Sequence, residues 1–171
     1  MIKEGLPFWA SSVFVVVYYN IDKVMLSMMV GDTAVGWYSV AYRLVAALNF
    51  IPIAFIASIF PITSRLYVSS RESLKFTCER SLKYLLIVGV PIGILVTLLA
   101  DKIILLVYGN EYMPSTTALQ ILVWSELLVF VNFAFGNLLN SINKQIIVAY
   151  ATAIAVALNV AMNGLLIPCL L

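Results

Sequence analysis

Four ionisable side chains lie within stretches of sequence that are otherwise apolar: Asp22, Lys23, Arg43 and Glu126. At the middle of a membrane helix each charge costs roughly 2.5–3.5 kcal/mol, so each needs a partner or water. The two cations have the chemistry to bind an anionic group, and the two acids have the chemistry to hold a proton or a sodium ion. These residues are therefore the candidates for function.

The residues that most hydrolytic enzymes need are missing from this sequence. The chain contains no histidine and only two cysteines, Cys78 and Cys169. This composition argues against His/Cys zinc sites, Ser-His-Asp triads, HExxH proteases and disulfide frameworks. An intramembrane aspartyl protease is disfavoured because the sequence has no GxGD motif. We expect no enzyme activity, no cofactor and no metal, and the net charge of +2 is too small to indicate nucleic acid.

The composition identifies a membrane protein. Of the 171 residues, 63% are hydrophobic and 11% are charged, and the mean hydropathy is +1.05. Soluble domains contain about 45–50% apolar and about 25% charged residues. A membrane crossing needs about 20 mostly apolar residues in a helix. The sequence contains five such runs, at residues 6–29, 35–60, 84–99, 115–139 and 145–170.

These runs predict an all-α, polytopic membrane helix bundle without a soluble domain. Residues 63–83 form a polar connection between the second and third runs. Residues 101–108 are too short to cross again, so they either continue the third helix or turn along the membrane surface. We expect residues 1–171 to form a single transmembrane domain that is a fragment of a larger transporter fold.

The basic residues predict the orientation in the cytoplasmic membrane. Alternating spans place seven of them on one side, and only Lys102 on the other. The seven are Lys3, Arg65, Arg71, Lys75, Arg80, Lys83 and Lys144. Because short cytoplasmic loops are enriched in lysine and arginine, we expect a cytoplasmic N-terminus and an external C-terminus.

The first two spans form a predicted hairpin whose turn is centred between Asp32 and Thr33. Asp22 and Arg43 are equally distant from that centre, which places them at one depth, about 12 Å inside the outer end. One interpretation is an ion pair that holds the hairpin together. The other is that Arg43 or Lys23 lines an aqueous cavity and binds an anionic head group.

Glu126 also allows two interpretations, since it falls near the middle of the fourth span. It is either a proton or sodium site, or a hydrogen-bonding partner of a neighbouring helix. Asparagines are also frequent in the spans, and we expect them to form bonds between helices. They are Asn20, Asn49, Asn132, Asn137, Asn159 and Asn163.

An ordered set of short motifs covers nearly the whole chain. It comprises residues 19–26 (YNIDKVML), Gly31, residues 35–38 (VGWY), residues 41–44 (AYRL), Ile51-Pro52, Phe60-Pro61, residues 107–112 (VYGNEY), residues 118–122 (ALQIL) and Asn159 with residues 163–168. The set resembles the polysaccharide transporter family, the O-antigen and lipid-linked oligosaccharide flippases. That family belongs to the multidrug/oligosaccharidyl-lipid/polysaccharide exporter superfamily.

Members of the family have twelve to fourteen helices in two lobes around a central cavity. This chain resembles only the start of the second lobe, from the seventh helix to the eleventh. The resemblance implies flipping of an isoprenoid-diphosphate-linked oligosaccharide from the cytoplasmic to the outer leaflet. It also implies that cavity cations meet the diphosphate, and Lys23 and Arg43 are the candidates for that contact.

Two alternatives to a glycan flippase stay open at this point. A cation-coupled drug or metabolite antiporter of the same superfamily would need a coupling acid, for which Asp22 and Glu126 are the candidates. A non-transporting membrane scaffold or a truncated gene relic would explain the missing lobe. The expected partners are the lipid bilayer, a lipid-linked glycan, and either a separately encoded N-terminal lobe or another copy of the chain.

Overall fold

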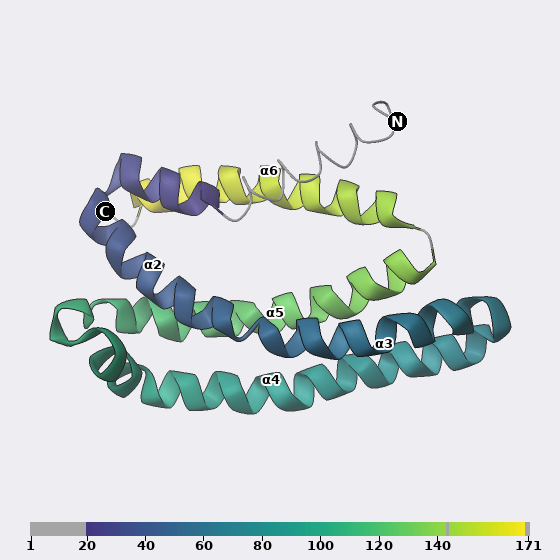
Figure 1. Cartoon of the computed structure of the whole chain (residues 1–171). Helices are drawn as coiled ribbons and strands as arrows, with labels where there is room; N and C mark the ends of the chain where they lie inside the picture. The colour runs from purple at the N-terminus through teal and green to yellow at the C-terminus, as the bar shows by residue number, and fades with distance from the viewer. Residues whose placement is uncertain (1–19, 143, 170–171) are drawn as a thin grey trace, which may run out of the picture. The chain divides into compact units, whose positions relative to one another are not determined.

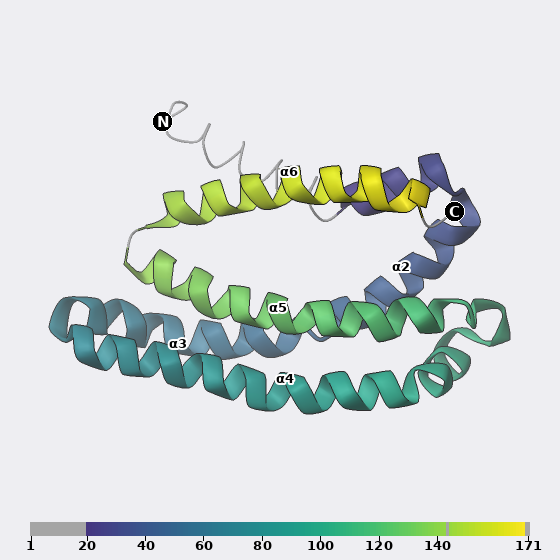
Figure 2. The same cartoon turned by 180° about the vertical axis from the view of Figure 1, so that it is seen from behind.

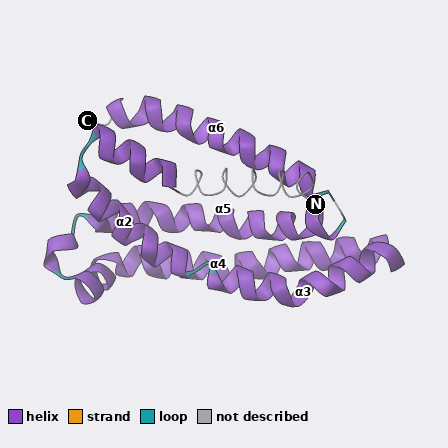
Figure 3. Ribbon diagram, turned by 45° about the horizontal axis from the view of Figure 1, so that its top comes forward, coloured by secondary structure: helices purple, strands orange, loops and turns teal. Residues whose placement is uncertain are grey.

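The computed structural model describes residues 20–142 and 144–169. That part of the chain consists of helices joined by short connections and contains no strand (Figure 3). Residues 20–29 are helical, and a turn follows at Val30. The elements that follow are α2 (Asp32–Ala47), α3 (Phe50–Ser69), α4 (Arg71–Tyr108), the short η1 (Asn110–Tyr112), α5 (Ser115–Ser141) and α6 (Gln145–Cys169). The predicted all-α helix bundle is confirmed.

Four helical stretches among the described residues are long and apolar enough to cross a membrane. They are Asp32–Ser69, Arg71–Tyr108, Ser115–Ser141 and Ile146–Leu165. They correspond to the predicted spans at 35–60, 84–99, 115–139 and 145–170. Most of the predicted span at 6–29 lies outside the described residues, and its last ten residues, 20–29, are helical.

The chain forms two compact units, one of residues 1–36 with 145–171 and one of residues 37–144. The first contains the helix at 20–29, the start of α2 and α6. The second contains the rest of α2 together with α3, α4 and α5. Figures 1 and 2 show α4 and α5 running side by side in opposite directions, with α3 alongside.

Two apolar clusters hold the larger unit together. The first core cluster joins α2, α4 and α5 through Val40, Ala41, Val45, Ala100, Ile104, Leu119 and Val123. The second core cluster joins α4 and α5 through Leu85, Phe130 and Ala134, and Ile51, Phe55 and Ile56 of α3 pack against it. Gly89 allows α4 to approach α5 closely, because a Cβ atom there would lie 2.6 Å from Leu127 Cδ2. Each cluster thus joins side chains from three helices.

The predicted span at 35–60 is interrupted in the structure. Helix α2 ends at Ala47 and α3 begins at Phe50. Around the break, backbone N–H groups donate to the carbonyl three residues earlier instead of four. Leu48 N donates to Val45 O at 2.9 Å, and Ile51 N donates to Leu48 O at 3.0 Å. Pro52 is the cause, because it has no N–H to donate to the carbonyl four residues earlier.

The polar stretch at 63–83 is helical rather than a loop, which corrects the predicted connection. Helix α3 continues to Ser69, α4 begins at Arg71, and the hydroxyl of Ser70 accepts from Ser73 N at 3.3 Å. Polar residues can continue a helix because its backbone groups are satisfied internally. With 38 residues, α4 extends about 57 Å, well beyond the roughly 30 Å of a hydrocarbon core. It also includes residues 101–108, which confirms that they continue the third helix.

Candidate functional site

Asp22 takes part in a polar cluster within the smaller unit. Asn163 Nδ2 on α6 donates to Asp22 Oδ1 at 2.6 Å and to Asn159 Oδ1 at 3.2 Å. Asn159 and Asn163 are one helical turn apart, so both side chains lie on the same face of α6. All of these contacts are partly buried. The cluster therefore joins α6 to the helix at 20–29, which is the interhelical role that we predicted for these amides.

The bond between Asp22 and Asn163 should contribute measurably to stability. Hydrogen bonds to charged groups contribute about 1.5–3 kcal/mol, so Asn163→Ala is expected to lower the free energy of unfolding by about 2 kcal/mol. A double-mutant cycle with Asp22→Asn, followed by denaturant unfolding in detergent, measures the coupling. Ser125→Ala is the matched control, because its hydroxyl bonds only within α5, to Leu122 O at 2.7 Å. A coupling energy of zero between positions 22 and 163 would contradict the expected contribution.

Lys23 and Arg43 belong to different units. Lys23 is half-buried on the helix at 20–29, and Arg43 is exposed on α2. Ala41 and Val45 bury their side chains in the first core cluster, and Arg43 lies between them in sequence, so it faces away from that cluster. Because Asp22 and Arg43 also lie in different units, the predicted ion pair between them stays a prediction.

Glu126 is buried in the larger unit, with 6% of its surface exposed. It belongs to a stripe of α5 whose buried positions recur every three or four residues. Val123, one turn before it, packs in the first core cluster, and Phe130, one turn after it, packs in the second. Within the described part of the chain, Glu126 Oε1 has no hydrogen-bond partner. A carboxyl group thus lies between two apolar clusters with one oxygen unsatisfied.

Asn49 lies at the same level of the bundle. It occupies the break between α2 and α3, and its neighbours Leu48 and Ile51 pack against the first and the second core cluster, respectively. Its side-chain oxygen Oδ1 is also buried without a hydrogen-bond partner in the described residues. We call Asn49 and Glu126 the polar layer. The sequence signals this layer through Glu126, a charge within an apolar span, and through Asn49, an asparagine beside Pro52, whose missing N–H opens the helix.

The polar layer has the chemistry of a small-cation or proton site. Amide and carboxylate oxygens are hard ligands, and buried polar groups without partners carry an energetic cost that a bound ion or proton relieves. An acid within a membrane helix is by itself a hypothesis for a functional site. Lys23 and Arg43, by contrast, are the positions with the chemistry to bind an anion.

The chain is similar to a curated protein that is described as a probable low-salt glycan biosynthesis flippase, Agl15 of Haloferax volcanii. The two are 25% identical over 151 residues, which is 88% of this chain and 32% of the relative. The chain thus spans about a third of the length of that protein. No solved structure matches the chain.

The family of the chain follows from a match to a family model. The model of the MatE family matches residues 7–165, which includes every predicted site residue and all the helices from residue 20 to most of α6. The match confirms the superfamily that the motifs along the chain predicted, and it agrees with the long apolar helices. The chain belongs to the MatE family and is a multi-pass membrane protein.

Proposed function

We propose that the chain is part of a flippase that moves an isoprenoid-diphosphate-linked oligosaccharide from the cytoplasmic to the outer leaflet of the cytoplasmic membrane. The observation that carries this proposal is the similarity to a probable glycan biosynthesis flippase over 88% of the chain. Membership of the MatE family supports transport, and the role described for the Haloferax relative supports a glycan as the cargo.

Lys23 and Arg43 are the proposed contacts for the diphosphate. A diphosphate that enters a low-dielectric cavity gives up hydration and needs fixed cations in its place. Arg43 suits this role because its side chain is exposed and faces away from the first core cluster. Its guanidinium carries a rigid fork of donors that matches phosphate oxygens.

The polar layer is the proposed coupling site. Glu126 would hold a proton or a sodium ion, with Asn49 as an additional oxygen ligand. Asp22 is the second coupling candidate, although its bond to Asn163 already provides a donor for one carboxylate oxygen. A cation-coupled drug antiporter would use the same acids. The cations at positions 23 and 43 favour an anionic cargo, because a cationic drug would be repelled.

The chain covers 32% of the relative, so we propose that a further lobe, in the same polypeptide or in another one, or a second copy completes the cavity. An intramembrane charge such as Lys23 needs an opposing protein surface that keeps lipid away. We also propose that the N-terminus and the α3–α4 turn face the cytoplasm, as the basic residues predict.

Complementation in Haloferax volcanii tests the proposed function. A strain without its own Agl15 flippase, supplied with the rest of that flippase and with this chain, is expected to regain the low-salt glycan. The chain without the complementary part should not restore it. A chain that inserts at normal levels beside the complementary part and restores no glycan would contradict the proposal, and would favour the scaffold or gene-relic alternative.

A further inference from the structure

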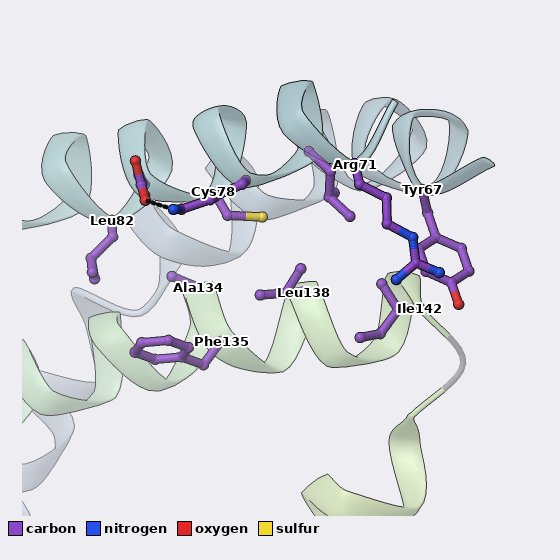
Figure 4. Close-up of a pocket in the computed structure, with 11 residues that line it drawn as sticks. Tyr67, Arg71, Cys78, Leu82, Ala134, Phe135, Leu138 and Ile142 are labelled. Atoms are coloured by element: carbon purple, nitrogen blue, oxygen red, sulfur yellow. Dashed lines mark ion pairs between the residues drawn. The ribbon is translucent and has the colours of Figure 1, made fainter. Parts of the chain in front are cut away.

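A pocket of about 360 Å³ opens at the end of the larger unit where α3 turns into α4 and α5 ends. All its lining residues lie within that unit. Figure 4 shows Tyr67 and Arg71 at one end of the pocket, with Leu82 and Phe135 toward the other. Its walls are mostly apolar, with Ala134 and Leu138 of α5, and Ile142 just after that helix, facing the first turns of α4.

The pocket has a basic end at Arg71, and the Lys75–Glu79 ion pair, the dashed line in Figure 4, lies toward the other end beside Leu82. Arg71 lies over the ring of Tyr67, with 5.3 Å from Cζ to the ring centre, which orients the guanidinium at the rim. Leu82 lies eleven residues further along α4, about 16 Å by the helical rise. An occupant of this pocket therefore combines an anionic group with an apolar chain.

The lining residues carry a net positive charge, because Glu79 offsets only one of the two basic residues. Arg71, Lys75 and Glu79 are the ionisable lining residues besides Tyr67 and Cys78. Lys75 Nζ lies 3.8 Å from Glu79 Oε1, but both side chains are largely exposed, at 79% and 65%. Exposed pairs of this kind are weak, so Lys75 can leave Glu79 and turn toward a phosphate at Arg71, one helical turn away. The positive end of the α4 helix dipole, at Arg71, adds to the attraction.

We propose that this pocket binds an anionic membrane lipid, with its phosphate at Arg71 and Lys75 and its chain along Leu82 and Phe135. The lipid is a resident of the leaflet that the α3–α4 turn faces, and it is distinct from the flipped glycan carrier. Basic residues beside an apolar span are a general signal for anionic lipid. The amphiphilic shape of the pocket adds a specific place for one such molecule.

Cys78 lines the pocket and is a built-in reporter. The full chain with Cys169→Ser, in nanodiscs, is labelled with a maleimide while the lipid composition is varied. Phosphatidylglycerol is expected to slow the labelling of Cys78 relative to phosphatidylcholine alone. Free inorganic phosphate should not slow it, because it lacks the chain that covers the thiol. The labelling of a cysteine at position 73 (Ser73→Cys with Cys78→Ser) should not change, since that position lies outside the pocket.

Two substitutions change the net charge of the pocket in opposite directions. Arg71→Gln should raise the phosphatidylglycerol content needed for half-protection about fivefold, the effect of one basic residue near an anionic surface. Glu79→Gln should lower that content, because it removes the acid that competes with the phosphate. Arg80→Gln is the matched control. It makes the same charge change on the same end of α4, where Arg80 stacks on Phe76 outside the pocket, and should have no effect.

Several outcomes would overturn the proposal. Equal effects of Arg71→Gln and Arg80→Gln would show a general surface potential and no site. Protection by a polyprenyl phosphate but not by phosphatidylglycerol would assign the pocket to the glycan carrier. Unchanged Cys78 labelling in every lipid would show that the pocket stays empty. None of these measurements involves transport, so their failure is separate from a failure of the proposed flippase function.

Discussion

Lys23→Gln and Arg43→Gln are each expected to abolish the glycan that the complemented flippase restores, while the protein inserts at normal levels. Each substitution removes one of the proposed charge-assisted contacts to the diphosphate. Such a contact contributes about 1.5–3 kcal/mol, so substrate binding should weaken about ten- to a hundredfold. Lys23→Arg should retain most of the glycan, because it keeps the cation. The measurement is the glycan level relative to the amount of membrane-inserted protein.

The control for this prediction is Lys102→Gln. It makes the same charge change at an exposed position of α4, far in sequence from the proposed contacts, and should leave the glycan level unchanged. Thermal unfolding of each variant separates substrate contact from folding. If both glutamine variants are stable and restore full glycan, the cations have no role in binding substrate. The interpretation that Asp22 and Arg43 merely stabilise the hairpin would then be favoured.

The span positions could be predicted from the sequence because a membrane crossing has a length and a composition that a single sequence displays. The polar residues at the ends of the apolar runs were less informative about where the helices end. Residues 63–83 indicated a loop, since Arg65, Arg71 and Lys75 are costly in lipid, yet the structure continues the helices through them to Ser69 and from Arg71. Charged residues indicate where the bilayer ends, whereas a helix ends where a capping residue or a proline interrupts its backbone hydrogen bonds.

The site could be predicted only as a set of residue types. Asp22, Lys23, Arg43 and Glu126 were recognisable because charges in apolar spans are rare and expensive. Their partners were not, since the contact of Asp22 with Asn163 joins residues 141 positions apart. The pocket beside Arg71 could not be predicted from the sequence for a similar reason. Its apolar wall on α5 lies beside Arg71 only after α4 and α5 have packed together.

Replacing Glu126 should separate stability from transport. Glu126→Leu is expected to raise the free energy of unfolding by about 1–3 kcal/mol, because it removes a buried oxygen that has no partner in the described residues. A leucine there would extend the apolar contact between the two core clusters. The same variant should lose transport, since it cannot hold a proton or a sodium ion. Glu126→Gln should fold like the parent and lose the dependence of transport on an ion gradient.

Asn137→Leu is the matched control for Glu126. Asn137 lies on the same stripe of α5, is also 6% exposed, and also has a buried side-chain oxygen without a partner among the described residues. Its replacement should stabilise the bundle without loss of transport, because the residue lies outside the polar layer. Unfolding of the purified chain and gradient-driven flipping by the complemented protein give the two readouts.

Reduced stability of Glu126→Leu, together with full gradient dependence of Glu126→Gln, would mean that Glu126 serves helix packing. A stable Glu126→Leu that no longer transports would mean that the acid is kept for function at the expense of stability.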